Sequence, residues 1–313
     1  MSKPLFFPIL ILVLLSVAGS VQAQDTAAPE AAANTVTAAI SEAADAAANT
    51  TTAASTEAAP AEVPASEPAA AAPPAPDSFG SDRLWIKLEG GGGLAFQGKL
   101  EDTLSTYKRQ AEALGAGFSG EVSRASFSGG LEIGYLVNPR WGFSFEAEAL
   151  FPGSMKAEAL VGGGTWTQEI SQMVVPATLN AYSYLPQGKR RFFVTAGGGV
   201  MLSRLSYEDT FTGAAARSAD FSGIGPCIRL GAGHQWLVGK NVLEAGIRGL
   251  WGSVSRYTGS VTDELGTYDA AMAEDADGNN GYIPKASVGT DGWEYLKMGL
   301  LDIDLRVGVS LLF

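Results

Sequence analysis

The clearest indication of the fold of this chain is in its last thirteen residues, Leu301-Asp302-Ile303-Asp304-Leu305-Arg306-Val307-Gly308-Val309-Ser310-Leu311-Leu312-Phe313. Apolar side chains occupy the odd positions from Leu301 to Phe313, whereas Asp302, Asp304 and Arg306 share the opposite row. A period of two indicates a β-strand. A water-soluble core does not need so many charges opposite so apolar a row, and we therefore expect the apolar face to point outward.

Seven earlier segments repeat this alternation, so the chain is expected to contain eight such strands. In the fourth segment, Pro176 makes the alternation less regular. The seven segments are Leu84–Glu89, Phe127–Val137, Phe143–Phe151, Ile170–Leu185, Phe192–Leu202, Ile224–Gly233 and Leu243–Trp251. Eight is the smallest usual strand number of a transmembrane β-barrel, and the fold class predicted is an all-β, antiparallel up-and-down barrel.

The connections between these segments alternate in length. Short turns are expected at Asn138–Arg140, Pro186–Arg190 and Gly239–Asn241, and long loops at Gln97–Glu121, Pro152–Gln168, Ser206–Phe221 and Arg256–Glu294. Short periplasmic turns and long extracellular loops are typical of bacterial outer-membrane barrels. Two aromatic girdles are expected at the membrane boundaries, with Trp85, Tyr135, Trp141, Phe192 and Trp236 at the short-turn end and Phe96, Phe151 and Trp251 at the other.

These features resemble the small outer-membrane β-barrel proteins, the group that includes the transmembrane domain of outer-membrane protein A and the opacity-type adhesins. The resemblance covers residues 84–313 and is architectural, without a motif that selects one subfamily. It implies that Phe313, a terminal aromatic residue on an outward-facing strand, is recognised by the barrel-assembly machinery.

The N-terminal quarter has a different composition. Residues 1–23 have the charge at Lys3, the apolar run and the small residues before Ala23 that are typical of a cleaved secretory signal peptide. A transmembrane helix would need about 20 apolar residues, and this run is shorter and contains Pro8. Residues 24–78 are nearly all Ala, Thr, Pro, Ser and Glu, which predicts a disordered periplasmic linker before a barrel domain at residues 79–313.

Composition narrows the function classes. A formal net charge of −12 argues against nucleic-acid binding, which requires basic patches. The single cysteine, Cys227, cannot form an internal disulfide and is expected to be a small strand residue. The glycine runs at residues 90–93 and 197–199 precede no helix and no Lys-Ser/Thr pair, so they do not predict a phosphate-binding loop.

Eleven charged residues fall on the inward rows of the predicted strands. In an eight-stranded barrel, side chains fill the lumen, and buried charges there should form ion pairs. We expect a salt-bridged plug, and the alternative is a narrow polar conduit. The residues are Lys87, Glu89, Glu132, Glu146, Glu148, Arg229, Glu244, Arg248, Asp302, Asp304 and Arg306. The carboxylates are numerous enough for a glycosidase-like pair, but such a lumen offers no cleft for a sugar chain.

His234 is the only histidine, and any histidine-dependent catalysis must use it. Enzymes on similar barrels that modify lipid A place a catalytic His and Ser at the outer side. The alternation places His234 on the outward row near a short turn, with no neighbouring serine. The sequence therefore predicts no catalytic residues and no cofactor, and a lipid-modifying enzyme remains an alternative.

The last long loop is acidic, and Asp275, Asp277 and Asn279 have the spacing of calcium ligands but lack the distal bidentate Glu. A solvated loop is the simpler interpretation. We expect a non-enzymatic integral outer-membrane protein whose extracellular loops serve adhesion, surface recognition or envelope integrity. The expected partners are membrane lipid, lipopolysaccharide and the assembly machinery, with peptidoglycan or a host or surface ligand as further candidates. The alternative is a small channel for small or apolar solutes.

Overall fold

The computed structural model of the 313-residue chain describes residue 79 and residues 83–275, 280–289 and 292–313. The predicted signal peptide at residues 1–23 and the linker at residues 24–78 lie outside the described residues and stay predictions.

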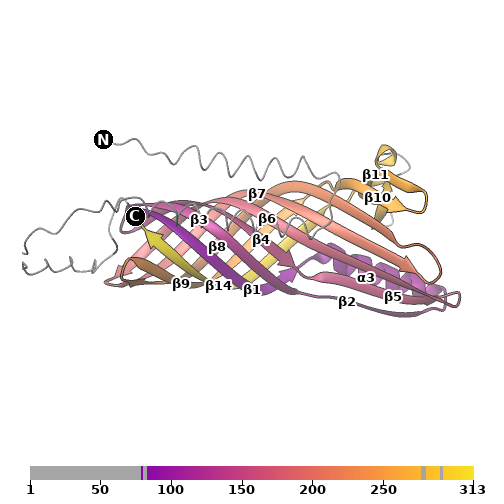
Figure 1. The fold of residues 1–313 in the computed structure, drawn as a ribbon, viewed down its shortest axis with the longest axis horizontal. Helices are drawn as coiled ribbons and strands as arrows, with labels where there is room; N and C mark the ends of the chain where they lie inside the picture. Colours follow the sequence, from indigo (N-terminus) through magenta and orange to yellow (C-terminus); the bar gives the residue numbers. More distant parts are fainter. Residues whose placement is uncertain (1–78, 80–82, 276–279, 290–291) are drawn as a thin grey trace, which may run out of the picture. The chain divides into compact units, whose positions relative to one another are not determined.

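In the described part of the chain, eight antiparallel strands close into a ring (Figure 1). Each strand pairs with the next one in the ring, and β14 pairs with β1 to close the barrel. The predicted up-and-down barrel is confirmed. The strands are β1 (Arg83–Phe96), β3 (Ala125–Asn138), β4 (Trp141–Pro152), β6 (Gly164–Gln187), β7 (Arg190–Phe211), β8 (Arg217–Val238), β9 (Asn241–Val254) and β14 (Met298–Leu312).

Tight turns join these strands at one end of the barrel. The strands continue to the pairs Gln187–Arg190 and Val238–Asn241, which leaves two residues in each turn. Gly188 and Gly239 stand first in these turns with φ of 67° and 64°. A positive φ at the first turn position is typical of the hairpin turns whose twist matches that of the strands they join.

The predicted inside and outside rows are confirmed along the barrel. On β1, for example, Leu88 is 67 % exposed, whereas its neighbour Lys87 is 1 % exposed. On β14, Leu305 and Val307 are exposed, and Arg306 between them is buried. An apolar exterior around a charged interior is the arrangement of a transmembrane β-barrel.

One girdle residue was predicted wrongly. Trp85 is 4 % exposed and lies in the lumen, because its position on β1 puts it on the same row as Lys87. At the same end, Tyr135 and Trp141 are exposed on the outer face as expected. A position near the membrane boundary therefore does not by itself place an aromatic ring against lipid.

The prediction of four long loops was also wrong in part, because much of this chain is folded. β6, β7 and β8 continue beyond the barrel as one sheet, and further strands extend that sheet on both sides (Figure 1). We call these outer segments together the loop module. Its additional elements are α3 (Gly98–Ala113), β2 (Gly117–Val122), β5 (Ser154–Val161), β10 (Thr258–Asp263), β11 (Gly266–Glu274), β12 (Asn280–Pro284), the short 3-10 helix η2 (Lys285–Ser287) and β13 (Glu294–Tyr295).

The continuous strands exchange their polar and apolar faces between barrel and loop module. On β7, the outward residues Val194 and Val200 are apolar, whereas the outward residues beyond them, Arg204 and Ser206, are polar. The inward residues change in the opposite sense, from Thr195 in the barrel to Leu205 and Tyr207 in the module. β6 and β8 make the same exchange. Lipid favours apolar side chains outside, and water favours them inside.

The helix α3 packs on the inner face of the module. It begins two residues after β1, and its row of Leu100, Leu104, Tyr107 and Ala111 follows the helical period. Leu100 and Ala111 are buried, and Leu104 and Tyr107 pack against the same core as Leu100. Among the described residues, no helix has the length and hydropathy needed to cross a bilayer.

Candidate functional site: the lumen and its outer seal

The lumen begins at the short-turn end with a layer of aromatic side chains. Trp85, Tyr182, Tyr184 and Phe193 are all at most 4 % exposed. Tyr182 and Tyr184 stack with ring centroids 5.6 Å apart, and Trp85 meets Tyr182 edge-on at 6.0 Å. These rings form an apolar floor to the lumen.

The side chain of Arg191 packs against the apolar floor at the turn end of the barrel. The guanidinium of Arg191 lies between two rings, 3.7 Å from the Tyr184 centroid and 3.9 Å from that of Phe79. Its Nε donates a hydrogen bond to Gln235 Oε1 at 2.6 Å. Phe79 is itself buried against Leu237 and Val242. Residue 79 is thus held at the mouth of the barrel by a cation–π contact.

The first part of the charged layer surrounds Lys87. Its Nζ lies 3.0 Å from Glu89 and 3.0 Å from Glu244, and it also contacts Glu132. Gln235 donates to the second oxygen of Glu244 at 2.5 Å. One ammonium with three carboxylates leaves this part acidic unless other cations join it.

Arginines supply those cations. Arg248 donates to both oxygens of Glu89 at 2.8 Å and to Glu146 at 2.5 Å. Arg306 lies 2.7 Å from Glu89 and 2.7 Å from Asp304 and also contacts Glu148. Arg229 contacts Glu146 and lies 2.5 Å from Glu148. Bidentate guanidinium–carboxylate pairs offset part of the desolvation that buried charges suffer.

Ten of the eleven inward charges predicted from the sequence therefore lie in one connected network. Asp302 is buried but forms no ion pair with a cation that the structure describes. Asp304, two residues along β14, joins the network and also accepts a hydrogen bond from Ser128 at 3.2 Å.

Glycines on facing strands make room for the long side chains. A Cβ at Gly231 would lie 3.0 Å from Arg248 Cγ, and one at Gly130 would lie 2.7 Å from Glu148 Cβ. At the floor, a Cβ at Gly134 would lie 2.1 Å from the ring of Trp85. The lumen is therefore packed to contact, as expected for a barrel of this size.

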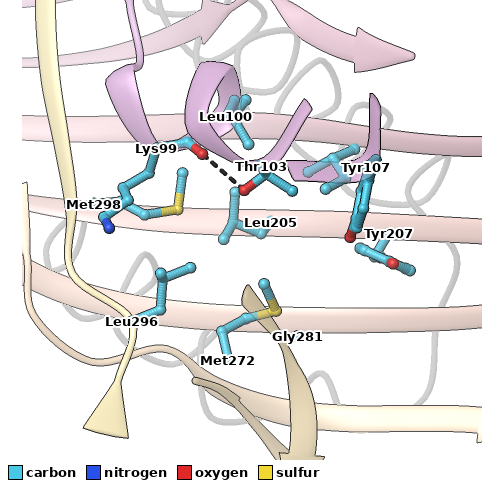
Figure 2. A pocket seen from close by; sticks show the side chains of 11 residues that line it. Lys99, Leu100, Thr103, Tyr107, Leu205, Tyr207, Met272, Gly281, Leu296 and Met298 are labelled. Atoms are coloured by element: carbon cyan, nitrogen blue, oxygen red, sulfur yellow. Dashed lines mark hydrogen bonds between the residues drawn. The ribbon is translucent and has the colours of Figure 1, made fainter. Parts of the chain in front are cut away.

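A third layer, apolar again, seals the lumen at the loop end. In Figure 2, Leu100 of α3 lies above Leu205 of β7, and Tyr107 of α3 reaches toward Tyr207, while Met298 of β14 approaches from the other side. The gap between them has a volume of about 10 Å³, which leaves room for one water molecule at most. Around the rim, Lys99 binds Glu274 of β11 at 2.5 Å, and Glu101 binds Arg124 after β2 at 2.7 Å. α3 is thus attached on both sides.

Polar groups beneath α3 are paired with one another. Tyr257 donates to Ser203 at 2.9 Å and accepts from Gln172 at 3.4 Å, and Gln168 contacts Tyr207. Burial raises the pKa of Tyr257 to about 12 and also raises the pKa of Tyr107 and Tyr207. These hydroxyls are neutral at ordinary pH.

The described acidic groups do not form an open metal site. Carboxylate oxygens of Glu89, Glu132 and Glu146 lie within 4.8 Å of one another, a spacing that could hold an ion. Lys87 and Arg248 already occupy that space as counter-charges. Of the calcium candidates, Asp277 and Asn279 lie outside the described residues, so that prediction stays open beside Asp275.

His234 lies on the outer wall, as its position in the alternation predicted. Its ring is 5.3 Å from Phe192 and 6.0 Å from Trp236. Cys227 is buried on the inward row of β8. Phe313 is 66 % exposed, and its backbone nitrogen donates to Leu84 at 2.9 Å, at the seam where the barrel closes.

Sequence reasoning missed α3 and the apolar seal beneath it. The helical spacing from Leu100 to Ala111 was available as a signal, with Glu101 in the first turn. The seal itself combines residues from segments as distant as Leu100 and Met298, and no local pattern links them.

Comparisons with known proteins find only distant structural likenesses. No family model and no curated protein matches the chain. Among solved structures it is similar to the outer membrane protein OprG from Pseudomonas aeruginosa (14 % identity, 76 % of this chain and 98 % of that one, TM-score 0.33). It is also similar to a major outer membrane protein from Thermus thermophilus (14 % identity, 74 % of this chain and 99 % of that one, TM-score 0.40). A third similar structure is the outer membrane protease OmpT from Escherichia coli (8 % identity, 76 % of this chain and 97 % of that one, TM-score 0.33). At these values the likenesses assign neither a ligand nor an activity to this chain.

Proposed function

We propose that the chain is a closed, non-enzymatic outer-membrane barrel that displays the loop module at the cell surface for adhesion, recognition or envelope integrity. The observation that carries this proposal is the filling of the lumen in three successive layers. An aromatic floor, an ion-paired middle and an apolar seal under α3 follow one another along the axis. Each layer would have to rearrange before a solute could pass.

Two further features favour a surface role over chemistry. The loop module is a folded sheet with its own apolar core, which presents its outer face in a defined geometry. The single histidine packs against Phe192 and Trp236 on the outer wall, away from the charged lumen. A lipid-modifying enzyme would require His234 to work there without the serine that such a mechanism uses.

Conductance in planar bilayers tests the closed barrel against a channel. The wild-type protein should give no steady current, and Arg306→Ala should raise the frequency of open events because Asp304, Glu148 and Glu89 lose a shared partner. Arg204→Ala removes an arginine from the outer surface and is the matched control. Steady ohmic current through the wild type would contradict the proposal and favour transport.

Lipid A analysis tests the enzyme alternative separately. Expression of the wild type and of His234→Ala should leave lipid A unchanged. A modification made by the wild type and lost in His234→Ala would make the barrel an enzyme.

A further inference from the structure

Exposed charge is divided unequally between the two ends of the barrel. The two-residue turns carry Arg140, Lys189 and Lys240, and Arg190 directly follows the second turn. All four residues are exposed. Every Asp and Glu that the structure describes outside the lumen lies at the other end, in the loop module. The turn end is therefore a basic rim on a chain whose formal net charge is −12.

The basic rim stands at the height of the aromatic girdle. Arg140 immediately precedes Trp141, which is 49 % exposed on the outer wall. Arg190 is the cross-strand neighbour of Trp236 on the same outward row, next to Phe192 and His234. Above these residues the outward rows are apolar except for Ser183, and Phe143 and Leu185 are more than half exposed. The cations thus lie where an apolar wall ends, beside amphipathic rings that favour an interface.

We propose that the basic rim binds the phosphate groups of anionic phospholipid headgroups in the periplasmic leaflet. This inference rests on the proposed membrane location. The charged groups of Arg140, Arg190 and Lys240 are each one or two residues from a lipid-facing side chain. They are therefore within reach of a headgroup whose acyl chains cover the apolar wall. The cell-wall polymer is the other anionic partner at this end, but it would lie beyond the girdle and would not need cations on the lipid-facing rows.

Lipid-selective quenching tests the proposal. The chain carrying Trp251→Phe keeps Trp141 and Trp236 as its tryptophans on the outer wall of the barrel and is reconstituted into mixed phosphatidylcholine and phosphatidylglycerol vesicles. One lipid at a time carries brominated chains, which quench a neighbouring indole. Brominated phosphatidylglycerol should quench more strongly, with a preference of about two- to fivefold that falls as salt is added.

Two matched variants assign the effect. Arg140→Gln, Arg190→Gln and Lys240→Gln together should abolish the preference. The control variant Lys108→Gln, Arg109→Gln and Lys285→Gln removes the same charge from exposed positions in the loop module and should keep it. Equal quenching by both lipids in the wild type, or a preference that survives in the rim variant, would overturn the proposal.

Other outcomes separate this inference from the proposed function. A folded outer-membrane barrel migrates differently on an SDS gel before and after boiling, and we call this difference the heat-dependent gel shift. No quenching by either lipid, together with no such shift, would mean that the chain does not insert and would contradict the membrane location. Insertion without a lipid preference, combined with sedimentation on peptidoglycan that the rim variant loses, would show that the basic rim binds the cell wall instead.

Discussion

At the scale of single residues, this barrel depends on matching long inward side chains with small neighbours. Gly134 faces the ring of Trp85, and Gly231 faces Arg248. In the sequence these glycines only interrupt the alternation. In the structure the facing side chain occupies the space that a Cβ at each glycine would need.

Gly134→Ala should therefore destabilise the floor of the lumen. The new Cβ would lie 2.1 Å from the ring of Trp85, which must shift in a packed layer, and we expect a loss of about 1–3 kcal/mol in the free energy of unfolding. Urea unfolding in detergent micelles, followed by tryptophan fluorescence, measures it. Gly129→Ala is the control, because its Cβ would meet nothing closer than 3.8 Å. Equal stability of both variants would show that the floor is loosely packed.

Arg248→Met should cost about 3–5 kcal/mol, because Glu89 and Glu146 would be left as buried carboxylates with too few partners. The same unfolding experiment measures the loss. Arg204→Met removes a surface pair with Asp220 and should change the free energy by about 1 kcal/mol or less. Combining Arg248→Met with Glu89→Gln should restore part of the stability. Failure of that rescue would mean that Arg248 contributes through packing.

At the scale of elements, α3 closes the loop end of the lumen through packing with strands that are distant from it in the sequence. Its apolar row covers Leu205 and Met298, and its rim ion pairs join β11 and the segment after β2. The barrel strands form a complete hydrogen-bonded ring without α3. We therefore expect that α3 can unfold while the barrel stays folded.

Leu100→Asp should release α3 while the barrel persists, because an unpaired carboxylate would enter the apolar seal. We expect protease on intact cells to cleave the loop module faster, with the heat-dependent gel shift retained. Ser105→Asp adds the same charge on the exposed face of α3 and should leave cleavage unchanged. Loss of the gel shift in Leu100→Asp would show that the two parts fold as one unit.

Alkaline pH should open the loop module. Burial raises the pKa of Tyr257 to about 12, above the value near 10 expected in the unfolded chain, so the folded state keeps its proton longer. The contribution of this residue is complete below pH about 10 and is lost as the pH rises toward about 12. Absorbance of tyrosinate against pH, with Tyr257→Phe as control, checks this. A midpoint of Tyr257 near 10 would contradict its burial.

At the scale of the whole molecule, the two ends of the barrel are expected to face different compartments. Leu265, at the tip of the β10–β11 hairpin, is 95 % exposed, and Lys240 occupies a turn at the opposite end. In a Cys227→Ser background, a membrane-impermeant maleimide should label Leu265→Cys on intact cells and leave Lys240→Cys unlabelled. Labelling of both positions only after lysis would place the whole protein inside the cell envelope.

The barrel could be predicted from local patterns in the chain. A period-two alternation is a local property, because each side chain's face follows from its position along the strand, and residues such as Leu305 and Arg306 therefore reveal inside and outside without knowledge of their partners. The alternation also placed Lys87, Glu146 and Arg248 in one lumen. The short turns around Gly188 and Gly239 then ordered the strands as neighbours.

Local patterns could not predict which charges meet in the lumen or how the loop module folds. Arg248 pairs with Glu89 across 159 positions of sequence, and Leu100 meets Met298 in one core. The outer halves of β6, β7 and β8 escaped prediction because their apolar residues turn inward once water replaces lipid outside. Whether the apolar face of an amphipathic strand points inward or outward depends on the solvent outside it. The alternation in the sequence does not show where along the strand lipid is replaced by water.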